Sequence, residues 1–317
     1  MKPRSLIFCL SLALIPSVTS AATTGTEEID WSAFVVEETF TPGDSADAEP
    51  VRLWLDLHPG LNWRSTDSVQ DTTTYTAEGI SDETVVSRMI GERFGRVTHR
   101  TPEGDAVIVE MLRLGRVESR EDDRWASDRR PRLPRSHRLT MDSQGRVQDL
   151  EMEWTENAGP FLPLYHGLVL RAERFMGPGR AQPGDQWTVT VRHPSFPDAV
   201  AICRTTFLGF EGESGHPLAV LGQDFEVEIP FPLLRGIHED RRSQDVIETH
   251  IDRSVARGSA RITHDISTGR PLRSREESDI STSYRVRSCT ATGELLSEER
   301  VASESHQETQ STIEYRN

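Results

Sequence analysis

Apolar and polar residues alternate with a period of two along most of the chain, as they do in strands that have one buried face. In the segment 51–57 every odd position is apolar, and the segments 187–191 and 225–229 alternate in the same way. Two longer alternating segments, 85–98 and 106–117, flank a turn rich in proline and glycine. The pattern therefore predicts a mainly β protein built from antiparallel hairpins.

One segment has a helical period instead. Between residues 161 and 176 the apolar residues recur at spacings of three and four, with Gly-Pro before the segment and Gly-Pro-Gly after it. We predict one α-helix here. Its apolar face offers candidate contacts for an apolar ligand held between helix and sheet, although the same residues would serve equally well as ordinary core: Phe161, Leu164, Leu168 and Phe175.

The helix divides the chain into two β-rich halves. Residues 51–158 form the first β half, residues 159–180 contain the bridging helix, and residues 181–290 form the second β half. The polar segment 21–50 is predicted to be a flexible N-terminal arm, with one short strand as the alternative within it. The segment 291–317 is polar and extended, which predicts an edge strand or a tail.

The two halves share a short signature. In the first half Asp142 leads through a turn to Gly145-Arg146, and in the second half Asp265 leads through a turn one residue longer to Gly269-Arg270. An arginine-rich loop precedes each of the two hairpins. We infer an internal duplication, which predicts two consecutive antiparallel β-meanders that form curved sheets or half-barrels.

The first twenty residues have the features of a secretory signal peptide. Lys2 and Arg4 give a positive start, residues 6–15 are an almost unbroken apolar run, and Val18 and Ser20 are the small residues expected before a cleavage site. A bilayer takes about 20 apolar residues to span, so the run is too short for an anchor. We expect cleavage and export to the periplasm or the cell exterior, with no transmembrane segment.

The chain is strongly acidic, with 36 Lys and Arg against 51 Asp and Glu and a formal net charge of −15. Such a charge repels nucleic acid, so nucleic-acid binding is excluded as a function class. Lys2 is the only lysine. After cleavage of the signal peptide, chemistry that needs a lysine nucleophile is therefore excluded as well.

Two cysteines remain in the exported chain, Cys203 and Cys289. In an oxidising compartment a lone pair of cysteines favours one disulfide, and we predict this bridge, with two free thiols as the alternative. A loop of this length gives a bridge worth roughly 4 kcal/mol in the chain-entropy model.

One arginine-rich loop departs from the acidic background. Arg129, Arg130, Arg132 and Arg135 lie together with two prolines. Guanidinium groups bind carboxylates and phosphates through paired hydrogen bonds, so the loop is a candidate site for an anion or a protein partner. An exposed linker between two hairpins is the alternative.

No catalytic signature stands out in the sequence. The chain lacks a Gly-x-Ser-x-Gly elbow and a His-Glu-x-x-His helix, and the segment 212–216 has the composition of a hairpin turn. We therefore expect no catalytic residue, no metal ligand set and no cofactor. An enzyme whose site is assembled from distant strands stays open as an alternative.

The strand entry Pro183-Gly184-Asp185-Gln186-Trp187, the central helix and the late Asp-x-x-x-Gly-Arg hairpin resemble uncharacterised exported β-rich domains. The architecture of these domains is similar to the lipoprotein-carrier half-barrels. The resemblance covers roughly residues 50–290 and carries over no functional residue. It implies an apolar concavity that binds acyl chains, on the analogy of fold alone.

These observations favour a non-enzymatic periplasmic binding or carrier protein for a lipophilic or envelope-associated ligand. The ligand would lie between sheet and helix, with specificity set at the rim. A structural or protein-interaction module of the cell envelope is the alternative hypothesis, and an enzyme is the second alternative.

Overall fold

The structure is a computed structural model that describes residues 30, 33–44, 49–77, 82–121, 124–127, 136–152, 159–212, 218–239, 245–290 and 292–316. The predicted signal peptide and the four loop arginines lie outside these residues. The elements in chain order are β1 (Val35–Thr41), β2 (Val51–Arg52), β3 (Asn62–Ala77), β4 (Glu83–Arg100), β5 (Ala106–Glu121), β6 (Arg124–Ser127), β7 (Ser136–Met141), β8 (Val147–Met152), α1 (Phe161–Glu173), β9 (Arg180–Ala181), β10 (Gln186–His193), β11 (Phe196–Glu211), β12 (Leu218–Ile229), β13 (Leu233–Glu239), β14 (Val246–Asp265), β15 (Arg270–Cys289) and β16 (Leu295–Arg316).

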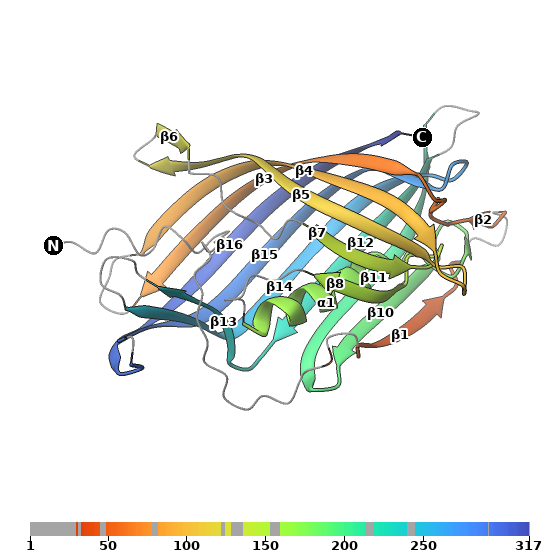
Figure 1. The fold of residues 1–317 in the computed structure, drawn as a ribbon. Coiled ribbons are helices and arrows are strands. Elements are labelled where there is room, and N and C mark those ends of the chain that lie inside the picture. The colour runs from red at the N-terminus through yellow and green to blue at the C-terminus, as the bar shows by residue number, and fades with distance from the viewer. Residues whose placement is uncertain are drawn as a thin grey trace.

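Within the described residues, fourteen strands form one antiparallel sheet. Its order is β1-β10-β11-β12-β14-β15-β16-β3-β4-β5-β7-β8, with β13 paired to β14 and β6 paired to β5. The short strands β2 and β9 pair with each other. Figure 1 shows the sheet curving around α1, which lies in its concavity. The predicted mainly β fold with one helix is confirmed, and the helix ends at Glu173 rather than at residue 176.

The C-terminal strand joins the two β halves edge to edge. β16 pairs with β15 on one side and with β3 on the other, where the register runs from Val301 to Arg316. The prediction of a tail or an edge strand for residues 291–317 is therefore wrong. The strand is polar because its concave face is polar as well, with Gln307 placed between Ser278 and Asp71.

The alternating segment 51–57 does not form the predicted strand. Residues 53–61, here called the strap, cross one end of the curved sheet. The Leu55 amide donates to the Ser143 carbonyl at 2.7 Å and the Asp56 amide donates to the Gly269 carbonyl at 2.7 Å. Leu53 is fully buried. The alternation thus reflects which side chains of the strap are buried against the protein, and it does not indicate a strand ladder.

The strap also brings together the two Gly-Arg hairpin tips. Gly145 and Gly269 both have positive φ angles, 88° and 69°, which side chains other than glycine rarely allow. Arg270 donates to Asp56 Oδ2 through Nε at 3.1 Å and NH2 at 2.9 Å. The repeated signature therefore marks two turns at the same end of the sheet, and the duplication itself stays a prediction.

Two hydrophobic cores lie on the concave side. The larger core fills the space between α1 and β10–β12, where Trp187 is 2% exposed and Phe207 and Leu221 are fully buried. The smaller core lies beneath the strap and contains Leu61 and Ile108. Both cores are placed at the inner face of the sheet, as the alternation of buried and exposed residues requires.

The convex face of the sheet carries ion pairs between β12 and β14. Arg257 NH2 lies 2.6 Å from Glu226 Oε1, and Arg253 NH2 lies 2.8 Å from Glu228 Oε1. An arginine on a lipid-facing strand costs about 2–4 kcal/mol at the middle of a bilayer. This part of the outer surface therefore suits contact with water.

Cys203 and Cys289 are both buried free thiols, so the predicted disulfide is wrong. Cys203 aligns through β12 and β14 with Ser278 on β15, three strands away, which is about 14 Å at the usual strand spacing. Cys289 lies a further eleven residues along β15, or about 36 Å. A disulfide needs the two Cα atoms within about 7 Å of each other.

We expect a reducing agent to leave the unfolding temperature of the protein unchanged. Burial, reinforced by Glu173, raises the pKa of Cys203 to about 12, so this thiol should not react with Ellman's reagent before unfolding. Titration of thiols in denaturant should find both cysteines. An unfolded chain that shows neither thiol, with a mass lower by two hydrogens, would contradict the structure.

Candidate functional site

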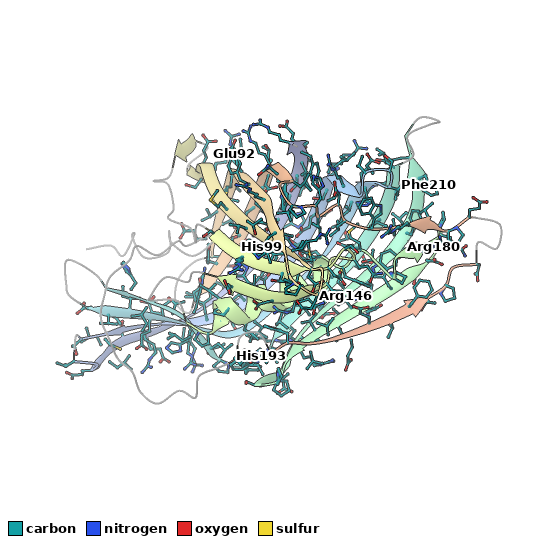
Figure 2. All side chains as sticks on the ribbon, turned by 45° about the vertical axis from the view of Figure 1, so that its right-hand side comes forward. Glu92, His99, Arg146, Arg180, His193 and Phe210 are labelled. Carbon is teal, nitrogen blue, oxygen red and sulfur yellow. The ribbon has the colours of Figure 1, made fainter. Side chains whose placement is uncertain are left out.

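The first and last strands of the sheet order approach each other across a seam. β1 and β8 are the two ends of that order. Arg146, which comes directly before β8, donates to the two Glu38 carboxylate oxygens on β1 through Nε at 2.6 Å and NH2 at 2.8 Å. Figure 2 shows Arg146 between the yellow-green hairpin of β7 and β8 and the red β1. The seam is therefore tied by an ion pair and not by a strand ladder.

A pocket of about 180 Å³ lies in the seam and is here called the seam pocket. This volume is below the 300–1,000 Å³ that is usual for drug-sized ligands, so the pocket suits a small one. It has an apolar wall and a polar wall. The apolar wall consists of Val36, Val147, Phe175 and Val189, and the polar wall of Glu38, Arg146, Gln148 and Arg171.

Arg171 is a buried cation that forms no direct ion pair with any described residue. The residue is 3% exposed, and its NH2 atom has no hydrogen-bond partner. NH1 lies 3.5 Å from the Gly167 carbonyl oxygen, and the guanidinium carbon lies 4.3 Å from the centre of the Phe34 ring. An uncompensated buried charge costs several kcal/mol, so an anion here would be stabilising.

Arg171 keeps its charge despite burial. Burial lowers its pKa to about 10, and Asp149 offsets only part of that effect. The group is therefore still protonated at neutral pH. Glu173, two residues later, behaves differently, because burial, reinforced by Glu276, raises its pKa to about 8. That carboxyl group is largely neutral at pH 7, so it is no counter-ion for Arg171.

The helix carries Arg171 into the core because the residue lies in the apolar stripe. Leu164, Leu168 and Arg171 follow one another at spacings of four and three, which places them on one helical face. Gly167 allows the close approach of Phe34, since a Cβ there would lie 2.3 Å from Phe34 Cζ. Phe34 then supports the guanidinium plane of Arg171.

The second arginine of the pocket is compensated. Arg146 pairs with Glu38 and also donates through NH1 to Asp142 Oδ2 at 3.1 Å. The hydrogen bonds to Glu38 raise the pKa of Arg146. Its guanidinium carbon lies 4.6 Å from the centre of the Phe175 ring. The excess positive charge of the seam pocket therefore belongs to Arg171.

Another buried charge in the interior is fully paired. Glu110, 2% exposed, accepts from Arg174 NH1 at 2.9 Å and NH2 at 2.7 Å, and its Oε2 lies 2.7 Å from His137 Nε2. Burial on its own would raise the pKa of Glu110, but Arg174 and His137 lower it strongly. Arg174 follows Arg171 by three residues, so a paired, partly buried arginine and a buried arginine without an ion pair lie close together in the sequence.

A second hollow, of about 850 Å³, lies on β3, β4 and β5 and is here called the outer groove. Phe94 aligns with Arg64 on β3 and with Met111 on β5, and Arg96 aligns with Val109. Side chains of neighbouring registered residues lie on the same face of a sheet. The intervening positions of β4 and β5 face the interior, so the groove opens outward.

The structure places the predicted ligand-facing residues in the larger core. Phe161, Leu164, Leu168 and Phe175 are 8%, 0%, 0% and 3% exposed. A side chain without accessible surface cannot line an open cavity, so the predicted apolar site between helix and sheet is filled at Leu164 and Leu168. Phe175 contributes to the seam pocket. The anion site predicted at Arg129, Arg130, Arg132 and Arg135 stays a prediction, outside the described residues.

Sequence reasoning missed the charged residues of the seam pocket. One signal for Arg171 was present, since an arginine in an apolar helical stripe is a buried cation that needs a partner. No signal pointed to Glu38, and the repeated signature marked Arg146 only as part of a turn, because the contact between the two joins residues 108 positions apart. In the described residues no group of three or more His, Cys, Asp or Glu is placed to hold a metal ion.

The part of the chain that the structure describes contains no helix with the length and hydropathy needed to cross a bilayer. No protein-family model matches the chain, and no curated protein matches its sequence. Its structural likenesses are distant and involve outer-membrane porins.

OccK7 (OpdD) of Pseudomonas aeruginosa is 8% identical, over 81% of this chain and 100% of that chain, with a TM-score of 0.21. A loop L8 deletion mutant of OmpT, an outer membrane protein of Vibrio cholerae, is 8% identical over 80% and 99%, with a TM-score of 0.17. A mutant porin of Rh. blastica is 9% identical over 78% and 99%, with a TM-score of 0.17. Similarity at these TM-scores carries no argument about function or location.

Proposed function

We propose that this chain is an exported, non-enzymatic binding or carrier protein whose ligand is a small organic acid. The observation that carries the proposal is the buried Arg171 guanidinium, which has no direct ion pair with a described residue and lines the seam pocket. A carboxylate accepts two hydrogen bonds from a guanidinium and cancels its charge. The ligand would supply the counter-ion that the described residues lack.

The apolar wall supports the choice of an organic acid over an inorganic anion. Val36, Phe175 and Val189 offer a carbon surface next to the guanidinium, against which a short alkyl group would lose water contact. Each buried methylene contributes about 0.8 kcal/mol. The volume of the pocket, about 180 Å³, restricts the ligand to a short chain. The lipophilic ligand that the sequence favours is thereby narrowed to one with only a few carbon atoms.

The test uses butanoate as the probe, measured by isothermal titration calorimetry on the full chain. Butanoate should bind with one-to-one stoichiometry, and butylammonium, of the same shape and opposite charge, should not bind. Inorganic phosphate should bind more weakly than butanoate. Phosphate binding without butanoate binding would overturn the assignment of an organic acid.

Arg171→Met should abolish butanoate binding and at the same time stabilise the unliganded protein by at least about 1 kcal/mol, because it removes an uncompensated buried charge. Arg204→Met replaces an exposed arginine on β11 and should change neither quantity. A destabilised Arg171→Met protein that still binds butanoate would show that Arg171 has a structural role only.

A further inference from the structure

We propose that the outer groove is a second, separate binding site, which takes a long-chain amphiphile with an acidic headgroup. The volume of about 850 Å³ falls within the range of small-molecule sites. This volume is several times that of the seam pocket, so an alkyl chain of about a dozen carbon atoms fits the outer groove and does not fit the seam pocket. Glu92 and Arg146 lie far apart in Figure 2, so the two sites are separate.

The floor of the groove is apolar, whereas the convex face over β12 and β14 carries ion pairs. Phe94 and Met111 lie side by side in the register of β4 and β5, and Met111 is 52% exposed. Val109 lies next to them along β5 and lines the same hollow. A single exposed apolar side chain is ordinary, but a contiguous apolar floor in a hollow marks a binding surface.

The rim of the groove is positive in a chain whose formal net charge is −15. Three arginines line it, together with a single carboxylate, Glu92. Glu92 is already paired with Arg64. Arg96 on β4 and Arg316 on β16 both align with Asn62 on β3, which lies between them. Neither arginine has an ion pair with any described residue. The rim thus complements a carboxylate, while the floor complements an alkyl chain.

The backbone shapes the groove from both sides. The ladder between β4 and β5 shifts register between Ile90 and Gly91 and again between Val97 and His99. β-Bulges bend a strand and increase its local twist. The segment between the two irregularities is the one that carries Glu92, Phe94 and Arg96, so the hollow is a fixed feature of the sheet and needs no movement of a loop.

The test is calorimetric titration of the full chain with dodecanoate below its critical micelle concentration. Dodecyltrimethylammonium has the same chain length and the opposite charge, and it should bind at least tenfold more weakly. Replacing both unpaired arginines, Arg96→Gln with Arg316→Gln, should weaken dodecanoate binding about tenfold or more, since a hydrogen bond to a charged group contributes enough for that factor.

Arg275→Gln is the matched control, because Arg275 is an exposed arginine on β15 outside the groove. Phe94→Ser should weaken dodecanoate binding as well, and its circular dichroism melt checks that it folds. Arg171→Met should leave dodecanoate binding unchanged, which separates this site from the seam pocket. Equal binding of the two amphiphiles, or full affinity in the double arginine variant, would overturn the proposal.

Discussion

We expect a chain that ends at residue 294 not to fold cooperatively. It lacks β16, which pairs with β15 along one edge and with β3 along the other. Without it the 20 residues of β15 and the 16 residues of β3 present open edges, and open edges pair with other chains. We expect no sigmoidal transition in the circular dichroism melt and high-molecular-weight species in size-exclusion chromatography.

A chain that begins at residue 49 is the matched control, since it also loses one terminal strand. β1 lies at an end of the sheet order, and all seven of its residues are exposed. This chain should fold as a monomer, with a lower unfolding temperature because the contact of Phe34 with α1 is lost. Equal behaviour of the two shortened chains would show that β16 does not hold the halves together.

The second large effect is expected at the buried ion pair of Glu110 and Arg174. Arg174→Met leaves Glu110 buried with His137 as its remaining partner, and we expect the free energy of unfolding to fall by about 3–5 kcal/mol. Replacing both residues, Glu110→Leu with Arg174→Met, should restore most of that loss, because no uncompensated charge is then left. Urea denaturation of the two variants and the parent measures both differences.

The same pair gives the protein an acid-labile contribution to stability. The folded-state pKa of Glu110 is lowered from its ordinary value, so the carboxylate binds protons more readily after unfolding. Its contribution is complete above the unfolded pKa, about 4.3, and is lost as the pH falls toward the folded value. Between pH 5 and pH 3 the parent should therefore lose more stability than the double variant. Parallel pH profiles would exclude Glu110 as the source.

The sequence predicts the local elements well where their periodicity is strong. The hairpin of β4 and β5 and the helix α1 lie where the alternation and the three-four spacing place them. The strap shows the limit of this reasoning. Leucines stand at every second position from Leu53 to Leu57 as they would in a strand, but the amides of Leu55 and Asp56 bond to hairpin tips far along the chain. Burial alone produces the pattern, and burial does not require a ladder.

The order of the strands could not be predicted, because it depends on pairings between distant segments. Polar composition makes β16 resemble a tail, and only the polar concave face that it completes explains why Ser305 and Gln307 occur there. The two cysteines illustrate the same limit, since their number favours a disulfide and their register excludes it. The seam pocket likewise joins β1, β8, β10 and α1, which meet only after the sheet has curved.

The central place of β16 also sets the order in which the chain can fold. β3 cannot be paired along both edges until residues 301–316 are present, and β1 must wait for β10, roughly 150 residues later. Folding is therefore dominated by contacts of long sequence separation, which makes it slow. The sheet of a growing chain therefore remains incomplete until β16 has been synthesised. A sheet that is completed this late would suit the export that the sequence predicts.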